Sequence, residues 1–92
     1  MAVEYTLPLT VAVPFEVLYA LALAARRWGP QAALRMEDGN TGLTVFRGRY
    51  RVGHRKRAPV GGAMLFIEHG CGDSWALAFA DADRQEKAPT RV

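Results

Sequence analysis

Alternating large and small side chains near the start of the chain predict a β-strand. From Tyr5 to Val13 every second residue is large and apolar, and smaller or polar residues occupy the positions between them. This period of two is typical of a strand with one buried face. Pro8 lies inside the run and cannot donate a backbone hydrogen bond, so we expect this strand at a sheet edge or a bulge.

The next segment has the features of a helix. Pro14 suits the first helical position, and Glu16 follows in the first turn. Arg26 and Arg27 lie in the last turn, where bases complement the helix dipole. Gly29 suits the position just after a helix, so we expect the helix to run from about residue 14 to residue 28. Its apolar side is formed by Val17, Leu18, Leu21, Ala24, Ala25 and Trp28.

After residue 30 the pattern returns to strands that are separated by turns. The segments 38–42 and 70–73 combine Gly with Asn or Asp, and these residues favour tight hairpin turns. Residues 54–62 form a longer basic loop between them. The predicted strands are Ala32–Glu37, Leu43–Val52, Ala63–His69 and Ser74–Asp81.

The last of these strands is predicted by alternation alone, because bulky Trp75, Leu77 and Phe79 alternate with alanines. The whole pattern predicts an α+β domain of order β-α-β-β-β-β, in which one long helix packs on a curved antiparallel meander. This order resembles that of cystatin-like folds, as a likeness of topology without a shared residue motif. We expect residues 1–82 to form a single domain and residues 83–92 to form a polar C-terminal tail.

Composition narrows the class of protein. The chain has 92 residues, the size of one domain, and its single Cys excludes the small secreted proteins that disulfides hold together. The apolar stretch from Val17 to Ala25 is too short to cross a bilayer, and no Lys or Arg precedes it as a signal peptide requires. We therefore expect a cytoplasmic protein with a reduced thiol and no membrane contact.

The hairpin expected near the end of the chain is apolar on both faces. Its outer face is expected to carry Leu65, Ile67, Ala76 and Ala78. An apolar patch on a small domain favours contact with a second copy, so we expect a homodimer that buries these residues. The alternative is that the first strand or the C-terminal tail covers this face.

Positive charge is concentrated in one short segment. Residues 47–57 contain six cations and no acid, whereas the whole chain has a formal net charge of +3. A basic strand that runs into a basic loop can hold phosphates or an acidic protein. The alternative is a solvated sheet face on which arginines oppose aggregation. The expected anion-binding residues are Arg47, Arg49, Arg51, His54, Arg55, Lys56 and Arg57.

Little in the sequence indicates catalysis, since the common nucleotide-binding, hydrolase and metalloprotease motifs are absent. His69, Cys71 and Asp73 are close in sequence, but one Cys is too few for a structural zinc site, and no metal or cofactor is expected. An enzyme is thus less expected than a binding domain. A metal-independent ribonuclease that uses Tyr50 or His54 for proton transfer stays open as a lesser alternative.

The sequence therefore predicts a small, non-enzymatic, homo-oligomeric binding domain. Its partner would be a nucleic acid or an acidic protein, held by the basic strand and loop. The competing prediction is a small-ligand pocket between helix and sheet, lined by Trp28, Glu68, Trp75 and Phe79.

Overall fold

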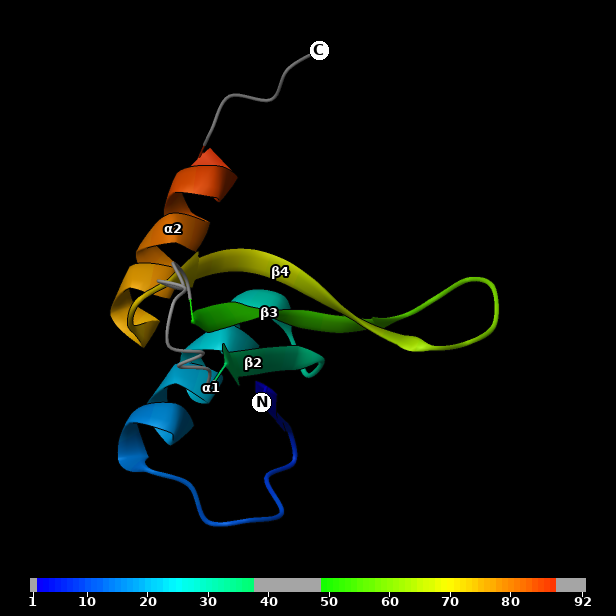
Figure 1. Ribbon diagram of the computed structural model, residues 1–92, viewed down its shortest axis with the longest axis horizontal. Helices are drawn as coiled ribbons and strands as arrows, with labels where there is room; N and C mark the ends of the chain where they lie inside the picture. Colours follow the sequence, from blue (N-terminus) through cyan, green and yellow to red (C-terminus); the bar gives the residue numbers. More distant parts are fainter. Residues whose placement is uncertain (1, 38–48, 88–92) are drawn as a thin grey trace, which may run out of the picture.

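The computed structural model describes residues 2–37 and 49–87, which form one antiparallel sheet and two helices (Figure 1). The strands lie in the order β1-β2-β3-β4. Their bounds, with those of the helices, are β1 (Ala2–Thr6), α1 (Phe15–Trp28), β2 (Ala32–Glu37), β3 (Tyr50–Arg57), β4 (Met64–Gly72) and α2 (Trp75–Lys87). The α+β class and the antiparallel sheet are confirmed. The single long helix and the cystatin-like order are not, because a second helix follows β4.

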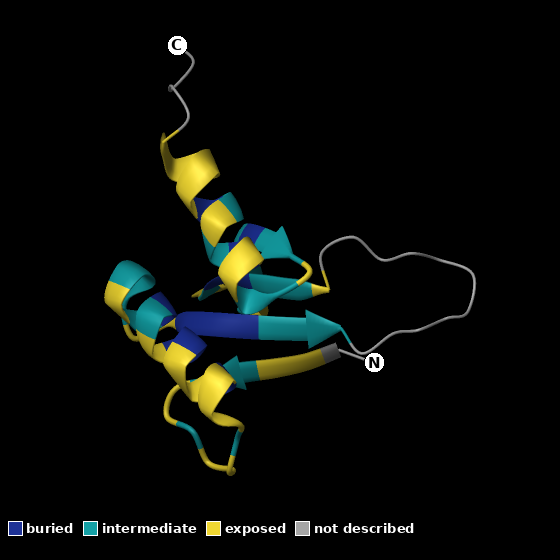
Figure 2. Cartoon of the chain, turned by 90° about the vertical axis from the view of Figure 1, so that its left-hand side faces the viewer, coloured by how far each residue is buried: buried dark blue, intermediate teal, exposed yellow. Residues whose placement is uncertain are grey.

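The core lies where the helices meet the central strands. Figure 2 shows buried residues on both helices and on the start of β2. The largest fully buried side chains are Leu21 of α1, Leu34 of β2 and Val52 of β3. Alanines such as Ala24 and Ala78 occupy most of the other buried positions. Because alanine is small, both helices can approach the sheet closely, and the core is correspondingly small.

α1 is the helix that the sequence predicted. Pro14 occupies the N-cap and not the first helical position. Gly29 follows the helix with a φ of 85°, and its N–H donates to the Ala25 carbonyl at 2.8 Å. This left-handed conformation explains the glycine. Leu18 was expected on the buried side but is 48% exposed, and the buried residues are Val17, Ala20, Leu21 and Ala24.

The strand predicted at Ser74–Asp81 is wrong, because this segment begins α2. Ser74 caps the helix: its Oγ accepts the N–H of Leu77 at 3.1 Å. Residues 83–87, expected to begin the tail, form the last turns of the same helix. The remaining tail residues, 88–92, lie outside the described part of the chain.

Close packing against β4 explains why this segment is helical. Ala78 and Ala82 are one helical turn apart and fully buried. They lie over two glycines of β4, Gly70 and Gly72. A Cβ atom on Gly70 would be 2.3 Å from the carbonyl oxygen of Ala78 and 2.5 Å from the backbone nitrogen of Ala82. The alternation of bulky residues with alanines is therefore also compatible with a helix whose small side faces the sheet.

The first strand is shorter than predicted. β1 ends at Thr6 and does not continue to Val13. Thr6 pairs with Ala33, and β2 begins only one residue before Ala33, so residues beyond Thr6 have almost no partner strand. The backbone then enters a loop through a cis peptide bond before Pro8.

The third and fourth strands are displaced from their predicted positions. β3 covers Tyr50–Arg57 where Leu43–Val52 was expected, and residues 43–48 lie outside the described part, as does the turn expected at 38–42. The basic loop expected at 54–62 is therefore a strand in its first half. β4 extends through most of the turn expected at 70–73.

The distal ends of β3 and β4 project from the sheet as a two-stranded ribbon, which we call the finger (residues 55–66). β2 pairs with β3 as far as His54, and beyond it β3 pairs only with β4. Figure 1 shows this ribbon extending past both helices and past β2. The finger brings the most basic residues of the chain to a projecting end.

Candidate functional site

One arginine at the centre of the predicted basic track is neutralised within the fold. Arg51 contacts Glu37 of β2 at 2.6 Å and Glu68 of β4 at 3.2 Å. These carboxylates lie on the strands that flank β3, so Arg51 is held from both sides. Arg51 is therefore not available to hold a phosphate without losing these partners.

Arg55 is also paired, through a shared acid. Its Nε lies 3.5 Å from Glu4 of β1, and the same carboxylate accepts a hydrogen bond from Arg35 at 2.9 Å. The Arg35 guanidinium in turn lies 4.7 Å above the ring of Phe66. These side chains remain partly exposed, so each ion pair contributes only about 0–1 kcal/mol. Arg51 and Arg55 were predicted as basic residues, but Arg35 and the acidic partners on the neighbouring strands were not.

Near the tip of the finger the cations keep their charge uncompensated. Lys56 and Arg57 are exposed, and no carboxylate in residues 2–37 or 49–87 forms an ion pair with either. The Arg57 guanidinium donates to the Gly62 carbonyl at 2.8 Å, which closes the ribbon. Successive strand residues point to opposite faces, so the two cations lie on opposite faces of the finger. Of the other predicted anion-binding residues, Arg49 is exposed just before β3, and Arg47 lies outside the described part.

A β-bulge at the base of the finger brings the two histidines of the chain together. Val52 pairs with Gly70, but the next residue, Gly53, pairs with Glu68, which leaves His69 as an extra residue in β4. The bulge turns the His69 side chain toward His54. Nδ1 of His54 and Nε2 of His69 are 2.7 Å apart. A Cβ on Gly53 would lie 2.0 Å from the Ile67 carbonyl oxygen, so the bulge requires glycine here.

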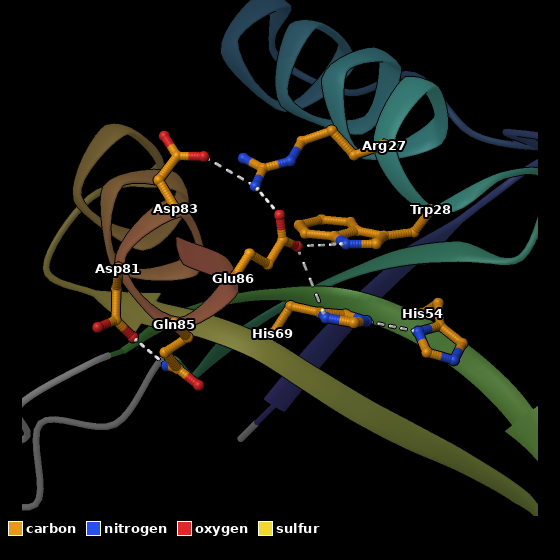
Figure 3. A network of polar contacts seen from close by, with 8 residues as sticks. All are labelled: Arg27, Trp28, His54, His69, Asp81, Asp83, Gln85 and Glu86. Carbon is orange, nitrogen blue, oxygen red and sulfur yellow. Dashed lines mark hydrogen bonds and ion pairs between the residues drawn. The ribbon is translucent and has the colours of Figure 1, made fainter. Parts of the chain in front are cut away.

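His69 also connects to both helices (Figure 3). Its ring stacks on Trp28 of α1, with the ring centroids 4.6 Å apart. Its Nδ1 lies 4.0 Å from Glu86 of α2, which accepts hydrogen bonds from the Trp28 indole at 3.0 Å and from Arg27 at 2.7 Å. Arg27 makes a second ion pair with Asp83 at 2.8 Å. The network thus joins the end of α1 to the second half of α2 across the bulge.

The network lowers the pKa values of both His69 and Glu86. Burial, reinforced by the positive charge of nearby His54, lowers the pKa of His69 below 6.5, and Glu86 opposes this shift. Hydrogen bonds from Arg27 and then Trp28 lower the pKa of the Glu86 carboxyl. At neutral pH the structure therefore holds an ionised Glu86 beside a neutral His69.

The arrangement does not favour the ribonuclease alternative. In-line cleavage of a phosphodiester requires a base and an acid on opposite sides of the phosphorus. The facing nitrogens of His54 and His69 are instead engaged with each other in one hydrogen bond. Tyr50, the other proton-transfer candidate, packs edge-on against Trp75, with ring centroids 4.7 Å apart.

The polar groups around Cys71, where the sequence predicted no metal site, make separate contacts. Burial raises the pKa of the Cys71 thiol, and the charges of Glu68 and Asp81 raise it further. The Cys71 backbone N–H donates to Asp81 of α2 at 3.0 Å. Residues 69, 71 and 73 do not converge, and within the described ranges no group of three or more His, Cys, Asp or Glu could hold a metal ion.

The predicted oligomer patch does not form one surface. Ala78 is fully buried in the core, and Ala76 lies on α2, whereas Leu65 and Ile67 belong to β4. Leu65 is 45% exposed on the finger, and Ile67 is half-buried. The hairpin that would have joined these residues does not exist, because α2 replaces its second strand. Whether the chain forms homodimers stays a prediction.

The four residues predicted to line a ligand pocket are not all brought to one pocket. Trp28 and Phe79 stack with centroids 6.0 Å apart, whereas Glu68 forms an ion pair with Arg51. A groove of about 340 Å³ instead lies between the two helices. It is lined by Phe15, Glu16, Tyr19, Ala20, Leu23, Trp75, Ala76 and Phe79.

Comparison with known proteins gave no matching family model, no matching curated protein and no matching solved structure. Neither described helix has the length and apolar character that crossing a membrane requires. The function must therefore be inferred from the residues and their geometry.

Sequence reasoning missed the network partners of His69. Arg27 was interpreted only as a base that suits the end of α1, and Glu86 was placed in the tail. The two residues are 59 positions apart, so no local pattern relates them. A helical interpretation of residues 75–87 would have needed Ser74 to be recognised as an N-cap.

Proposed function

We propose that this chain is a small binding domain that engages a nucleic acid through the finger. The observation that carries the proposal is the projecting ribbon, on which Lys56 and Arg57 are exposed without acidic partners in the described chain. The finger contains three cations and no acid. Closely spaced phosphates are the ligands that such a cluster attracts most strongly.

The position of these cations supports a nucleic acid more than an acidic protein. A protein interface of standard size buries about 800 Å² on each partner and usually has an apolar centre. The finger is narrow, and its cations lie on opposite faces, so it offers no broad surface of that kind. A phosphate backbone requires only a few correctly spaced charges.

The proposal is tested by measuring the affinity of the chain for duplex DNA and for RNA, each of mixed sequence, at several salt concentrations. We expect log affinity to fall with log salt concentration with a slope of about −2, one unit for each of Lys56 and Arg57, because Arg55 is paired with Glu4. A slope near zero would contradict nucleic-acid binding. Equal binding of polyglutamate that is lost on substitution Lys56→Gln would assign the finger to acidic proteins instead.

The two lysines of the chain provide a matched pair of variants. Lys56→Gln removes a finger charge, whereas Lys87→Gln removes an exposed charge at the end of α2. We expect Lys56→Gln to reduce the slope by about 1 and to weaken binding roughly threefold or more at physiological salt. Lys87→Gln should bind like the unmodified chain. Equal effects of the two substitutions would point to general charge attraction and not to the finger.

The groove between the helices favours a second candidate function, the binding of a small apolar ligand. Its walls include Trp75 and Phe79, and its volume of about 340 Å³ is within the range of ligand pockets. Anilinonaphthalene sulfonate is a suitable probe, and Trp28→Phe leaves Trp75 as the reporting tryptophan. Ala76→Arg should abolish a saturable response, and Ala80→Arg, at an exposed position of α2 outside the groove lining, should not.

Self-association remains a proposal from the sequence. Ala78 is buried and Ala76 lines the groove between the helices, so Leu65 and Ile67 are the suitable positions for a test. Sedimentation equilibrium of the unmodified chain and of Leu65→Glu would decide it. A dimer that becomes a monomer in this variant supports the proposal, and a monomeric unmodified chain removes it.

A further inference from the structure

The tip of the finger has a tightly closed backbone. Ala58 N–H donates to the Ala63 carbonyl at 2.7 Å, and the Arg57 side chain donates to the Gly62 carbonyl at 2.8 Å. Gly61 and Gly62 have φ values of 82° and 70°, a region that favours glycine. The turn is therefore held in a defined shape by both backbone and side-chain bonds.

An apolar residue occupies the most distal part of this turn. Val60 follows Pro59 and is 87% exposed, more than any other exposed large hydrophobic residue of the described chain. Water is an unfavourable environment for a valine side chain, so burial against a partner would be favourable. Lys56 and Arg57 lie just behind the turn, on opposite faces of the ribbon. The tip thus combines an apolar point with a cation on each side.

The tip of the turn, though not the full width of the two-stranded ribbon, can enter the minor groove of B-form DNA. That groove is about 6 Å wide and has a row of phosphates along each wall. A cation on each face of the ribbon can contact one wall, while the apolar tip meets the stacked base pairs between them. The minor groove of A-form RNA is wide and shallow, so a narrow tip would not contact both walls there. Duplex DNA is therefore the better match.

We propose that the finger bends duplex DNA by inserting Val60 between neighbouring base pairs from the minor groove. Partial unstacking by an apolar side chain kinks a duplex, and phosphate contacts on both sides hold the bent form. Bending costs least at pyrimidine–purine steps, because these steps are the most easily deformed. They would therefore be the preferred sites. This inference rests on the proposed function, since the finger must first bind DNA.

End-to-end energy transfer on a labelled duplex of about 30 base pairs tests the inference with the full chain. Binding should raise the transfer efficiency because bending brings the two labels closer. Val60→Ser shortens the wedge and makes it polar at an exposed position, so the fold is retained, as circular dichroism would verify. Val11→Ser is the matched control, because Val11 is also an exposed loop valine, at 67%, and lies outside the finger.

We expect Val60→Ser to bind duplex DNA within about threefold of the unmodified affinity while losing most of the change in energy transfer. Val11→Ser should bind and bend like the unmodified chain. The inference would be overturned if Val60→Ser bent the duplex as much as the unmodified chain does. It would also be overturned if the unmodified chain bound in a salt-dependent way but left the duplex straight. Either result would leave the proposed function standing. Binding to RNA at least about tenfold tighter than to duplex DNA would overturn it as well. A complete lack of nucleic-acid binding would remove both.

Discussion

The imidazole rings of His54 and His69 meet through Nδ1 and Nε2 atoms 2.7 Å apart, at the point where a bulge shifts the register between β3 and β4. Without the bulge after Val52, His69 would pair with Gly53 and point away from the helices. The contact has room for one N–H, so one ring donates and the other accepts, and protonation of the accepting nitrogen would remove the hydrogen bond. The pair therefore makes the base of the finger sensitive to acid.

We predict that the chain loses stability as the pH falls below about 6.5. The folded-state pKa of His69 is lowered from 6.5, so the unfolded chain binds the proton more readily over the interval below that value. Unfolding is therefore favoured as the pH falls from 6.5 toward the lowered pKa. His54 and Arg27 face the ring and reinforce this effect, and Glu86 opposes it.

Denaturant unfolding measured near pH 7.5 and near pH 5.5 checks this prediction. The pKa of Glu86 is lowered from 4.5, so its carboxylate stays ionised over this interval and does not account for the change. His69→Gln should reduce the difference between the two conditions. Equal or greater stability near pH 5.5 would contradict the assignment.

Gly70→Ala tests the contact between α2 and β4. The added Cβ would meet the backbones of Ala78 and Ala82, which cannot move unless the helix moves. We expect a loss of unfolding free energy on the order of 3 kcal/mol. Adding Ala82→Gly should restore little, because two of the three close contacts involve backbone atoms. Full rescue by this second substitution would show that the helix lies farther from the strand.

Ser74→Ala tests the start of α2. The substitution removes the oxygen that accepts the Leu77 N–H, and N-cap removal typically costs about 1 kcal/mol. Ser74→Asp should retain the stability, since aspartate is an equally good N-cap and its charge suits the helix dipole. A strand at this position would show no such difference between alanine and aspartate in a thermal unfolding experiment.

We expect Cys71 to react slowly with iodoacetamide at mildly alkaline pH. Burial, followed by the charges of Glu68 and Asp81, raises the pKa of its thiol, and only the thiolate attacks. Glu68→Gln should accelerate the reaction because it removes one of the negative charges that oppose ionisation. A reaction as fast as that of a small free thiol would show that Cys71 is more exposed and less influenced by these carboxylates.

The local signals of the sequence predicted α1 and β2 well. Glu16, Arg26, Arg27 and Gly29 are all within or beside the helix that they specify, so their effect depends on neighbours a few residues away. The strand predicted at Ala32–Glu37 is present with those bounds. The basic character of residues 55–57 was also evident without any structure.

The same reasoning failed at α2, because the local pattern there is compatible with both a strand and a helix. Trp75, Leu77 and Phe79 alternate as a strand would require, but Ala78 and Ala82 also define the small side of a helix. The choice between them depends on Gly70 and Gly72, which leave room for a helix on β4. No feature within residues 75–87 shows that this space exists.

The sequence by itself determined the first helix, the strand β2 and the concentration of positive charge, because each depends on residues that are close together along the chain. Only the tertiary structure decided which charges remain without acidic partners. Glu37 and Glu68 reach Arg51 from neighbouring strands, whereas Lys56 extends past the last residue of β2 that could have paired with its strand. Strand register sets these distances, and register follows from the packing of the whole domain.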